Sequence, residues 1–398
     1  MLDKLNNPIL DFDDTAIAFE RKTDAELRQM RFLFGMMNRA WLVSIGSRLT
    51  LLALKIRLPI QGIIKKTIFK QFCGGANLAE CAVSAAVLAK YKVKTVLDFG
   101  VEAKTTEADF DRTEQENLKA IQFAAKDGNV PIISVKVSGL AQFDLLEKVS
   151  AKKLLSSAQQ QAFERAKKRL ENICIAAADN GVAIFVDAEE SWIQDAIDAL
   201  AMEMMQAYNR KKVVVYNTFQ MYRHDRLAYL KASWETAQAG QFLLGAKIVR
   251  GAYMEKERER AKNMNYPSPI QPDKAASDRD YNLAVEFCVA NYETMASCVA
   301  SHNQKSSALQ ASLILEKGID RQHAHLSFCQ LYGMSDNLTF NLAKAGFNTS
   351  KYVPYGAVNE VMPYLIRRAK ENSSVNGEVS RELGFIVSEI NRRRNEKQ

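Results

Sequence analysis

The chain has 398 residues, is 47% hydrophobic and 25% charged, and carries a formal net charge of +8. These values predict a globular protein with one large domain plus an appendage, or with two or three ordinary domains, and no run of about 18 uncharged apolar residues indicates a membrane-spanning helix. Lysine and arginine alternate with acids, which favours a solvated basic surface over a nucleic-acid site. Any basic attraction could equally face an anionic membrane surface.

Residues 1–92 carry no strand pattern and are expected to form a helical N-terminal arm. The start of the chain shows no secretory leader, and its acidic stretch "LDFDDT" is unlike a mitochondrial presequence. The six cysteines are scattered without a CxxC pair, which indicates reduced thiols, mostly in the core, in a cytosol-like compartment.

From residue 93 the pattern changes to short β-branched runs, each followed by a helical stretch. The eight runs are 93–100, 130–139, 181–189, 212–219, 244–253, 297–303, 324–330 and 350–356. Such an alternation is typical of a parallel sheet, and eight units predict a distorted (β/α)₈ TIM barrel over residues 93–375. An open doubly wound sheet is the alternative. Residues 376–398 are expected to form a short helical tail with a frayed, basic end.

A polar residue occurs at the carboxyl end of every predicted strand, where a barrel of this kind places its site. In chain order these residues are Asp98 and Glu102, Lys136, Asp187, Gln220, Arg250 with Gly251 and Tyr253, His302 with Asn303, Gln330, and Tyr352. Lys136 and Asp187 stand out because a charge within an apolar run is costly unless it is paired.

The sequence was also searched for a zinc site and for nucleotide-binding motifs, which would indicate other kinds of enzyme. His323 and His325 have the i, i+2 spacing that puts two imidazoles on one face of a strand, which raises a zinc-dependent hydrolase as an alternative. The pair sits at the start of strand seven, however, which is the wrong end for the site, and no metal is predicted. Neither GxGxxG nor GxxxxGK[ST] occurs, so any nucleotide cofactor must be held by the barrel itself.

"YLIRRAKENSS" (364–374) is predicted to form a helix that Pro363 opens. One interpretation is that this helix exposes a surface face with an ion pair between Arg367 and Glu371. The preceding "EVMPYLI" is strongly apolar, which favours a half-buried helix. If this helix covers the barrel mouth, Arg367 and Arg368 are suited to clamp a carboxylate or a phosphate.

The motifs "VKVSG", "VDAE", "KIVRGAY", "SHN" and "KYVPYG…VMPYLIRRAKENSS" resemble those of the proline dehydrogenase family in order and spacing. The resemblance covers residues 93–375, and the arm resembles that of single-function members. It implies a barrel that binds FAD, oxidises L-proline to Δ1-pyrroline-5-carboxylate by hydride transfer from C5 to flavin N5, and passes the electrons to a membrane quinone. It also implies a bacterial, cytoplasmic enzyme, with peripheral contact at the inner face of the inner membrane left open. Neither a nucleic-acid partner nor an oligomeric state is implied.

The resemblance also implies roles for individual residues. For the catalytic and substrate-binding set these are Lys136, Asp187, Tyr253, Leu331, Tyr352, Arg367, Arg368 and the gate residue Glu102. For FAD they are Gln220, Lys247, Arg250, Gly251, Lys274, His302 and Asn303. Lys247 replaces an arginine found in some members and keeps only its charge. Tyr352 crowds C4 of proline and thereby disfavours hydroxyproline, whose oxidation is an alternative function. A scaffold barrel without activity is a further alternative.

Overall fold

The protein is described by a computed structural model that covers residues 10–56, 58–100, 104–374 and 378–398. Eight parallel strands follow one another around a closed barrel, and β8 pairs with β1. The strands are β1 (Val93–Phe99), β2 (Ile132–Val135), β3 (Ala183–Val186), β4 (Val215–Gln220), β5 (Leu244–Val249), β6 (Met295–Ala300), β7 (Leu326–Leu331) and β8 (Thr349–Tyr355). The predicted (β/α)₈ barrel is therefore confirmed, and the open sheet is wrong.

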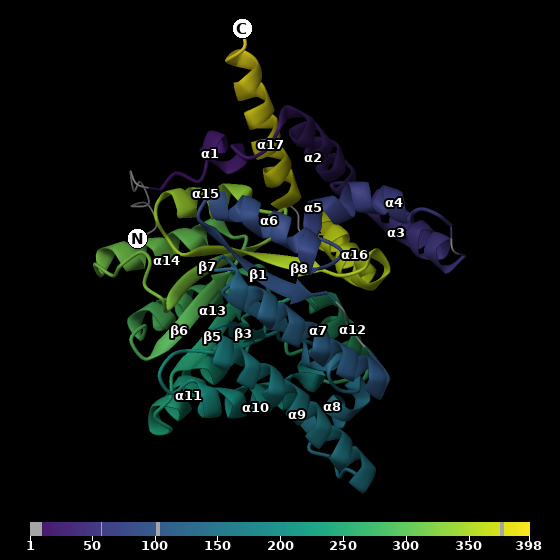
Figure 1. Cartoon of the computed structure of the whole chain (residues 1–398), viewed down its shortest axis with the longest axis vertical. Helices are drawn as coiled ribbons and strands as arrows, with labels where there is room; N and C mark the ends of the chain where they lie inside the picture. The colour runs from purple at the N-terminus through teal and green to yellow at the C-terminus, as the bar shows by residue number, and fades with distance from the viewer. Residues whose placement is uncertain (1–9, 57, 101–103, 375–377) are drawn as a thin grey trace.

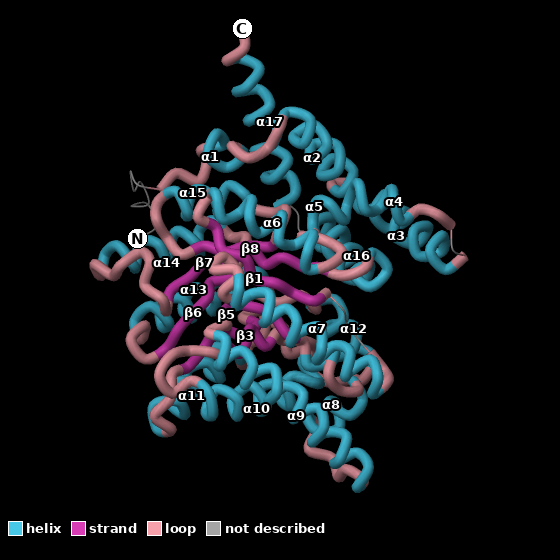
Figure 2. Tube along the Cα trace, in the orientation of Figure 1, coloured by secondary structure: helices cyan, strands magenta, loops and turns pink. Residues whose placement is uncertain are grey.

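Helices surround the strands, as Figure 2 shows in cyan around magenta. Before the barrel lie α1 (Thr15–Phe19), α2 (Asp24–Met37), α3 (Ala40–Lys55), α4 (Gln61–Ile64), the π-helical turn η2 (Lys65–Phe69), α5 (Lys70–Phe72) and α6 (Leu78–Lys90). Within and after it lie α7 (Glu107–Lys126), the 3₁₀ turn η3 (Val137–Gly139), α8 (Phe143–Ser150), α9 (Ser157–Asn180), α10 (Ser191–Tyr208), α11 (Arg226–Ala239), α12 (Met254–Asn263), α13 (Lys274–Ala290), α14 (Gln304–Glu316), α15 (Asp336–Lys344), α16 (Val358–Ser374) and α17 (Glu378–Asn395). Within the described ranges, no helix has the length and apolarity needed to cross a bilayer.

Local sequence signals set several of these helix ends. Ser156 and Gln159 form a reciprocal capping box at the start of α9, and Gly181 ends that helix in the left-handed region with φ of 70°. The main hydrophobic core lies between the strands and the outer helices. A second apolar cluster fills the barrel interior and includes Phe185, Tyr216, Cys298, Cys329 and Tyr352. All six cysteines are unpaired and buried, as predicted.

The N-terminal arm and the last two helices share one hydrophobic cluster. Phe34 of α2 and Phe72 of α5 are in the same buried cluster as Leu365 of α16 and Ile386 of α17. Figure 1 shows these purple and yellow elements together on one side of the barrel. The arm therefore braces α16, the helix that carries the two adjacent arginines.

Two predicted helix ends are wrong. Helix α16 begins at Val358, so Pro363 lies inside it instead of opening it. An interior proline costs about 3 kcal/mol, and the complete burial of Val361 and Leu365 offsets that cost. Helix α17 is also longer than a short tail, with 18 residues. Its basic end is not frayed, because Arg393 pairs with Glu389 and donates to the carbonyl oxygens of Phe19 and Lys22.

Candidate active site

Three of the predicted site residues, Lys136, Asp187 and Tyr352, meet at the carboxyl end of the barrel strands. Lys136 follows β2 directly, and Asp187 follows β3 directly; the register Val135–Val186 puts them side by side. The Nζ atom of Lys136 lies 3.1 Å from Oδ2 of Asp187, and the Tyr352 hydroxyl donates to that same oxygen at 2.6 Å. Lys136 and Tyr352 therefore lie within hydrogen-bonding distance of a shared carboxylate, that of Asp187.

Asp187 also binds a second lysine. Lys247 Nζ lies 2.6 Å from Oδ1 of Asp187 and 4.7 Å from the centre of the Tyr352 ring. Asp98, at the end of β1, completes the group, with Oδ1 3.2 Å from Lys136 Nζ. Two lysines thus face two carboxylates, so the interior cluster is electrically neutral when all four are ionised.

The electrostatics fix the charge state of this cluster. Burial by itself would raise the pKa of Asp187, but Lys247 and Lys136 outweigh it and hold that pKa well below its usual range. Burial and the neighbouring Asp187 carboxylate raise the pKa of Tyr352 well above 10. At neutral pH the site therefore holds an ionised aspartate and a neutral phenol that donates to it.

A separate cluster suited to an anion surrounds Arg250, after β5. Its guanidinium donates to Asp278 at 2.8 Å, to the Ser301 hydroxyl at 2.9 Å and to the Ser306 hydroxyl at 2.9 Å. Lys274 shares Asp278, at 2.5 Å. Two cations therefore share one carboxylate. Ser306 is also in the first turn of α14, where the positive end of the helix dipole attracts anions.

His302 and Asn303 follow β6 on the same side. Asn303 caps α14 by accepting from the Ser306 N–H at 3.1 Å. Nδ1 of His302 lies 2.8 Å from the Ser335 hydroxyl. Burial, followed by Lys351 and Arg368, lowers the pKa of His302 to about 3, so its imidazole is neutral.

Gln220 and Gly251 occupy constrained positions at the ends of β4 and β5. Buried Gln220 donates to the Glu189 carbonyl at 2.7 Å. Gly251 has φ of 134°, and a Cβ there would lie 2.5 Å from the Tyr222 ring, so only glycine fits.

Helix α16 lies over this end of the barrel. Cζ of Arg367 lies 5.9 Å from the ring centre of Tyr253, which follows β5, and Cζ of Arg368 lies 5.5 Å from the ring of Tyr364. Leu331 ends β7 and packs half-buried against the barrel interior. The suggested position of α16 at the barrel mouth therefore agrees with the structure. Glu102, the predicted gate, lies outside the described residues.

The helix α17 adds residues that sequence reasoning missed. Glu382 accepts from the Ser335 N–H at 2.8 Å and from its hydroxyl at 3.0 Å. Because that hydroxyl donates to Glu382, it accepts from Nδ1–H of His302. Arg381 also donates to the His302 carbonyl at 2.7 Å. No sequence signal links residues 381 and 382 to this site.

Buried Lys351 was missed as well, although a signal existed. It lies within the apolar β8 and pairs with Asp336, with Nζ 2.9 Å from Oδ1. The argument that singled out Lys136, a charge inside an apolar run, applies equally to Lys351.

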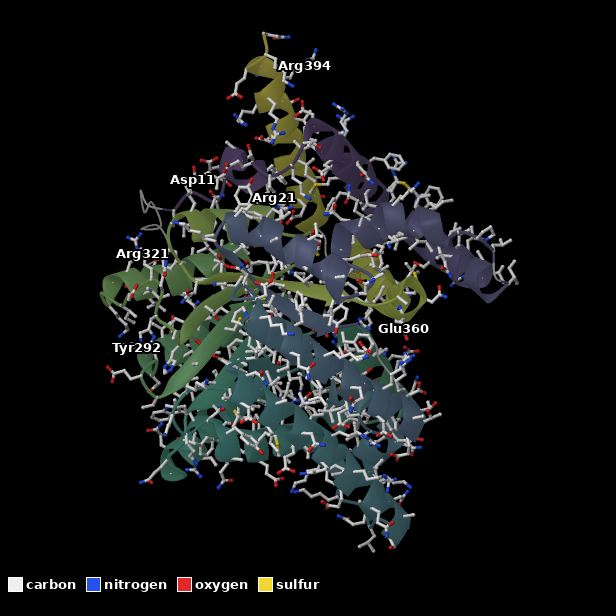
Figure 3. All side chains as sticks on the ribbon, in the orientation of Figure 1. Asp11, Arg21, Tyr292, Arg321, Glu360 and Arg394 are labelled. Atoms are coloured by element: carbon white, nitrogen blue, oxygen red, sulfur yellow. The ribbon has the colours of Figure 1, made fainter. Side chains whose placement is uncertain are left out.

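The histidine pair raised as a zinc site lies at the amino end of β7, before Leu326, as expected. His325 Nδ1 lies 2.7 Å from the Tyr292 carbonyl oxygen, and His323 Nδ1 accepts from the His325 N–H at 3.2 Å. Figure 3 shows Tyr292 on the opposite side of the barrel from Glu360 of α16. The part of the chain that the structure describes contains no group of three or more metal-ligating side chains.

Comparison with known proteins supports one family. The family model described as proline dehydrogenase matches residues 81–381. The chain is 33% identical to the mitochondrial proline dehydrogenase 1 of Dictyostelium discoideum, over 84% of this chain and 66% of that protein. It is 29% identical to the hydroxyproline dehydrogenase of Xenopus laevis, over 96% of this chain and 90% of that protein.

Among solved structures, proline utilization A (PutA) from Bdellovibrio bacteriovorus inactivated by N-propargylglycine superposes with a TM-score of 0.71. The sequences are 23% identical, and the match covers 80% of this chain and 34% of that protein. This likeness supports the barrel fold.

Proposed function

The chain belongs to the proline dehydrogenase family, and from this premise we propose that it oxidises L-proline to Δ1-pyrroline-5-carboxylate with FAD as cofactor. The observation that carries the proposal is the position of α16 at the end of the barrel that holds the interior cluster. Arg367 lies over Tyr253 at the same end of the barrel as Lys136 and Asp187. Cations on a covering helix and a neutral, hydrogen-bonded cluster beneath it suit a small zwitterion with one carboxylate.

In this proposal the chain's residues bind and orient proline. Arg367 and Arg368 bind its carboxylate through charge-assisted hydrogen bonds, and the interior lysines pair with Asp98 and Asp187. Lys136 lies between these two carboxylates and supplies a fixed donor. Tyr352 is held by Asp187 and presents its ring beside C4, and Tyr253 and Leu331 wall the pocket. When Glu102 pairs with Arg367, the site is closed.

The residues around Arg250 fit the FAD pyrophosphate. Arg250 and Lys274 share only one carboxylate, Asp278, and they lie beside serine hydroxyls at the start of α14. We assign Gln220, Lys247, Gly251, His302 and Asn303 to the rest of the cofactor. When bound, FAD supplies the acceptor for the hydride that leaves proline C5. A membrane quinone is the proposed final electron acceptor, reached at the cytoplasmic face of a bacterial inner membrane.

An absorption spectrum tests the proposal. The purified protein should take up FAD, and L-proline should bleach the flavin band in the absence of oxygen. A colourless protein that binds no FAD, or a flavin that proline leaves oxidised, would overturn it. Turnover with a water-soluble quinone analogue then tests the electron acceptor. If no quinone supports turnover, the proposed quinone acceptor is wrong, and the proposed oxidation of proline with FAD still stands.

Substrate choice depends on Tyr352. The Nζ atoms of Lys136 and Lys247 lie 5.9 Å and 4.7 Å from the centre of its ring, and its hydroxyl donates to Asp187. We therefore expect kcat/KM for proline to exceed kcat/KM for trans-4-hydroxyproline. Tyr352→Ser should reduce the ratio of these two values about 10- to 200-fold, because it opens space at C4. Phe219→Leu, which changes a fully buried ring outside this pocket, is the control. A wild-type preference for hydroxyproline would contradict the reading of Tyr352.

A further inference from the structure

The largest group of exposed apolar side chains lies on the N-terminal arm. We define the docking face as the exposed side chains on α2, α3, α4 and the residue after α3. They are Phe32, Met36, Trp41, Ile45, Leu49, Leu52, Ile56 and Ile63. Their exposed fractions run from 42% for Met36 to 70% for Phe32. A large group of exposed apolar side chains marks an interaction site.

The helix α3 displays these side chains as one stripe. Trp41, Ile45 and Leu49 are spaced by four residues, and Leu52 and Ile56 continue the same face. The opposite side of α3 packs against α2 and α16, with Val43 buried. Figure 1 shows α3 and α4 projecting from the rest of the molecule. The stripe therefore faces outward and is not packed on the barrel.

Charge identifies what covers the docking face. Between Glu26 and Glu80 the sequence contains nine lysines and arginines and no aspartate or glutamate. Of these, Arg28, Arg31, Arg39 and Arg48 are exposed on or beside α2 and α3. The two lysines with ion pairs in this segment use the flanking acids: Lys65 lies 2.8 Å from Glu80, and Lys70 lies 3.8 Å from Glu26.

We propose that the docking face binds the surface of an anionic lipid bilayer, with the stripe of α3 in the acyl–headgroup boundary and the arginines on the lipid phosphates. A tryptophan and aliphatic residues beside basic residues are the chemistry such an interface selects. A second copy of the chain fits poorly, because a two-fold interface would set these cations against the same cations. Peripheral docking needs no spanning helix.

This surface lies next to the helix that covers the site. Because α3 packs on α16, a docked bilayer would lie one helix layer from Arg367 and Arg368. A quinone dissolved in the bilayer would then reach the protein beside the barrel mouth. This consequence rests on the proposed function, whereas docking itself rests on the surface.

Vesicle flotation with the full FAD-loaded chain tests the proposal. We expect binding to vesicles of phosphatidylcholine containing about one third phosphatidylglycerol, weak binding to phosphatidylcholine alone, and loss of binding with added salt. Ile45→Glu combined with Leu49→Glu should weaken the binding at least about tenfold. The matched control combines Leu154→Glu with Met264→Glu, which are 100% and 58% exposed and lie outside the docking face.

Trp41 reports on the depth of docking. It is 62% exposed, whereas Trp192 and Trp234 are half-buried against the barrel core. Brominated lipids should therefore quench part of the fluorescence of the wild type, and Trp41→Phe should abolish that quenching. Sedimentation velocity without lipid tests whether a second copy of the chain covers the docking face instead. A wild-type dimer that becomes a monomer in the double glutamate variant would overturn the proposal.

The proposal also fails if the wild type does not float, or if the double variant binds as the wild type does. Flavin bleaching by proline in the double variant shows that the site is intact. Failure of bleaching in the wild type, with vesicle binding retained, would overturn the proposed function and leave the docking face in place.

Discussion

Asp187 neutralises two lysines at once, one on each carboxylate oxygen, and the Tyr352 hydroxyl donates to one of those oxygens. The charge balance of the barrel interior therefore depends on this residue. Losing this carboxylate is costly, because it would remove the counter-charge that two buried lysines share. In the proposed function, the arginines of α16 bind the substrate anion at the same end of the barrel.

Arg367→Ala should raise KM for proline far more than it weakens FAD binding. A charge-assisted contact to a carboxylate contributes about 1.5–3 kcal/mol, which corresponds to a KM increase of about 10- to 150-fold. Steady-state kinetics and a flavin titration measure the two effects. Arg258→Ala, an exposed arginine of α12, is the control. An unchanged KM would mean that Arg367 does not contact the substrate.

Glu189 gives a pH dependence of stability. Burial raises its pKa from 4.5 to about 7, although Ser138 donates to it from both its N–H and its hydroxyl. The folded chain thus holds this proton more tightly than the unfolded chain. The resulting stabilisation is complete below about pH 4.5 and is lost as the pH rises through about 7.

Glu189→Gln should remove that pH dependence. We expect the variant to be more stable than the wild type at pH 8, by at most about 3 kcal/mol, and no more stable at pH 4.5. Chemical unfolding across this range measures the difference. Glu190→Gln, whose carboxylate pairs with Lys256 at 2.9 Å, should keep the wild-type pH profile between pH 5 and 8. Parallel profiles for Glu189→Gln and the wild type would contradict the assignment.

At the scale of elements, the C-terminal helix α17 contacts site residues that lie far from it in the sequence. Its Glu382 holds Ser335, which begins α15 in the left-handed region with φ of 48°. Ser335 in turn accepts from His302, so the helix end determines which imidazole nitrogen carries the proton. Nε2 of His302 is thereby left as an acceptor.

Ser335→Ala should remove the hydrogen bond that keeps the proton of His302 on Nδ1. Nitrogen NMR of the chain labelled in its four histidines should show His302 protonated at Nδ1 in the wild type and shifted toward Nε2 in the variant. We also expect weaker FAD binding. Ser380→Ala, an exposed serine on the same helix, should leave both readouts unchanged. An Nδ1 tautomer that persists in Ser335→Ala would refute the relay.

For the whole molecule, one buried ion cluster joins the N-terminal arm to the barrel. Arg21, after α1, and Lys351 of β8 both pair with Asp336, and all three side chains are at most 6% exposed. Thr15 of α1 also donates to buried Glu389 of α17 at 2.9 Å. Burial opposes the ionisation of Asp336, but Arg21 and Lys351 lower its pKa to about 2. Its stabilisation is therefore present above pH 4 and declines toward pH 2.

Asp336→Asn should destabilise the fold by about 3–5 kcal/mol, because it leaves two buried cations without their carboxylate. Thermal unfolding at neutral pH measures this loss. The exposed Asp320→Asn should have no comparable effect. A variant as stable as the wild type would show that the N-terminal arm is not held through this cluster.

The sequence by itself determined the barrel, because alternating apolar runs and helical stretches are local patterns that follow from backbone geometry and side-chain size. It also pointed to Lys136 and Asp187, since a charge within an apolar run needs a partner wherever the chain folds. The adjacent arginines on the last barrel helix were visible for the same reason, as charges beside a strongly apolar segment.

Only the tertiary structure decided which groups are partners. The lysine of β5 that shares Asp187, the reach of Glu382 to Ser335, and the start of α16 before Pro363 all depend on strand register and helix packing across long stretches of chain. The same holds for the exposed stripe of α3, whose spacing matches that of a buried helix. Periodicity shows that a helix has an apolar face, and only packing determines whether protein or solvent meets that face.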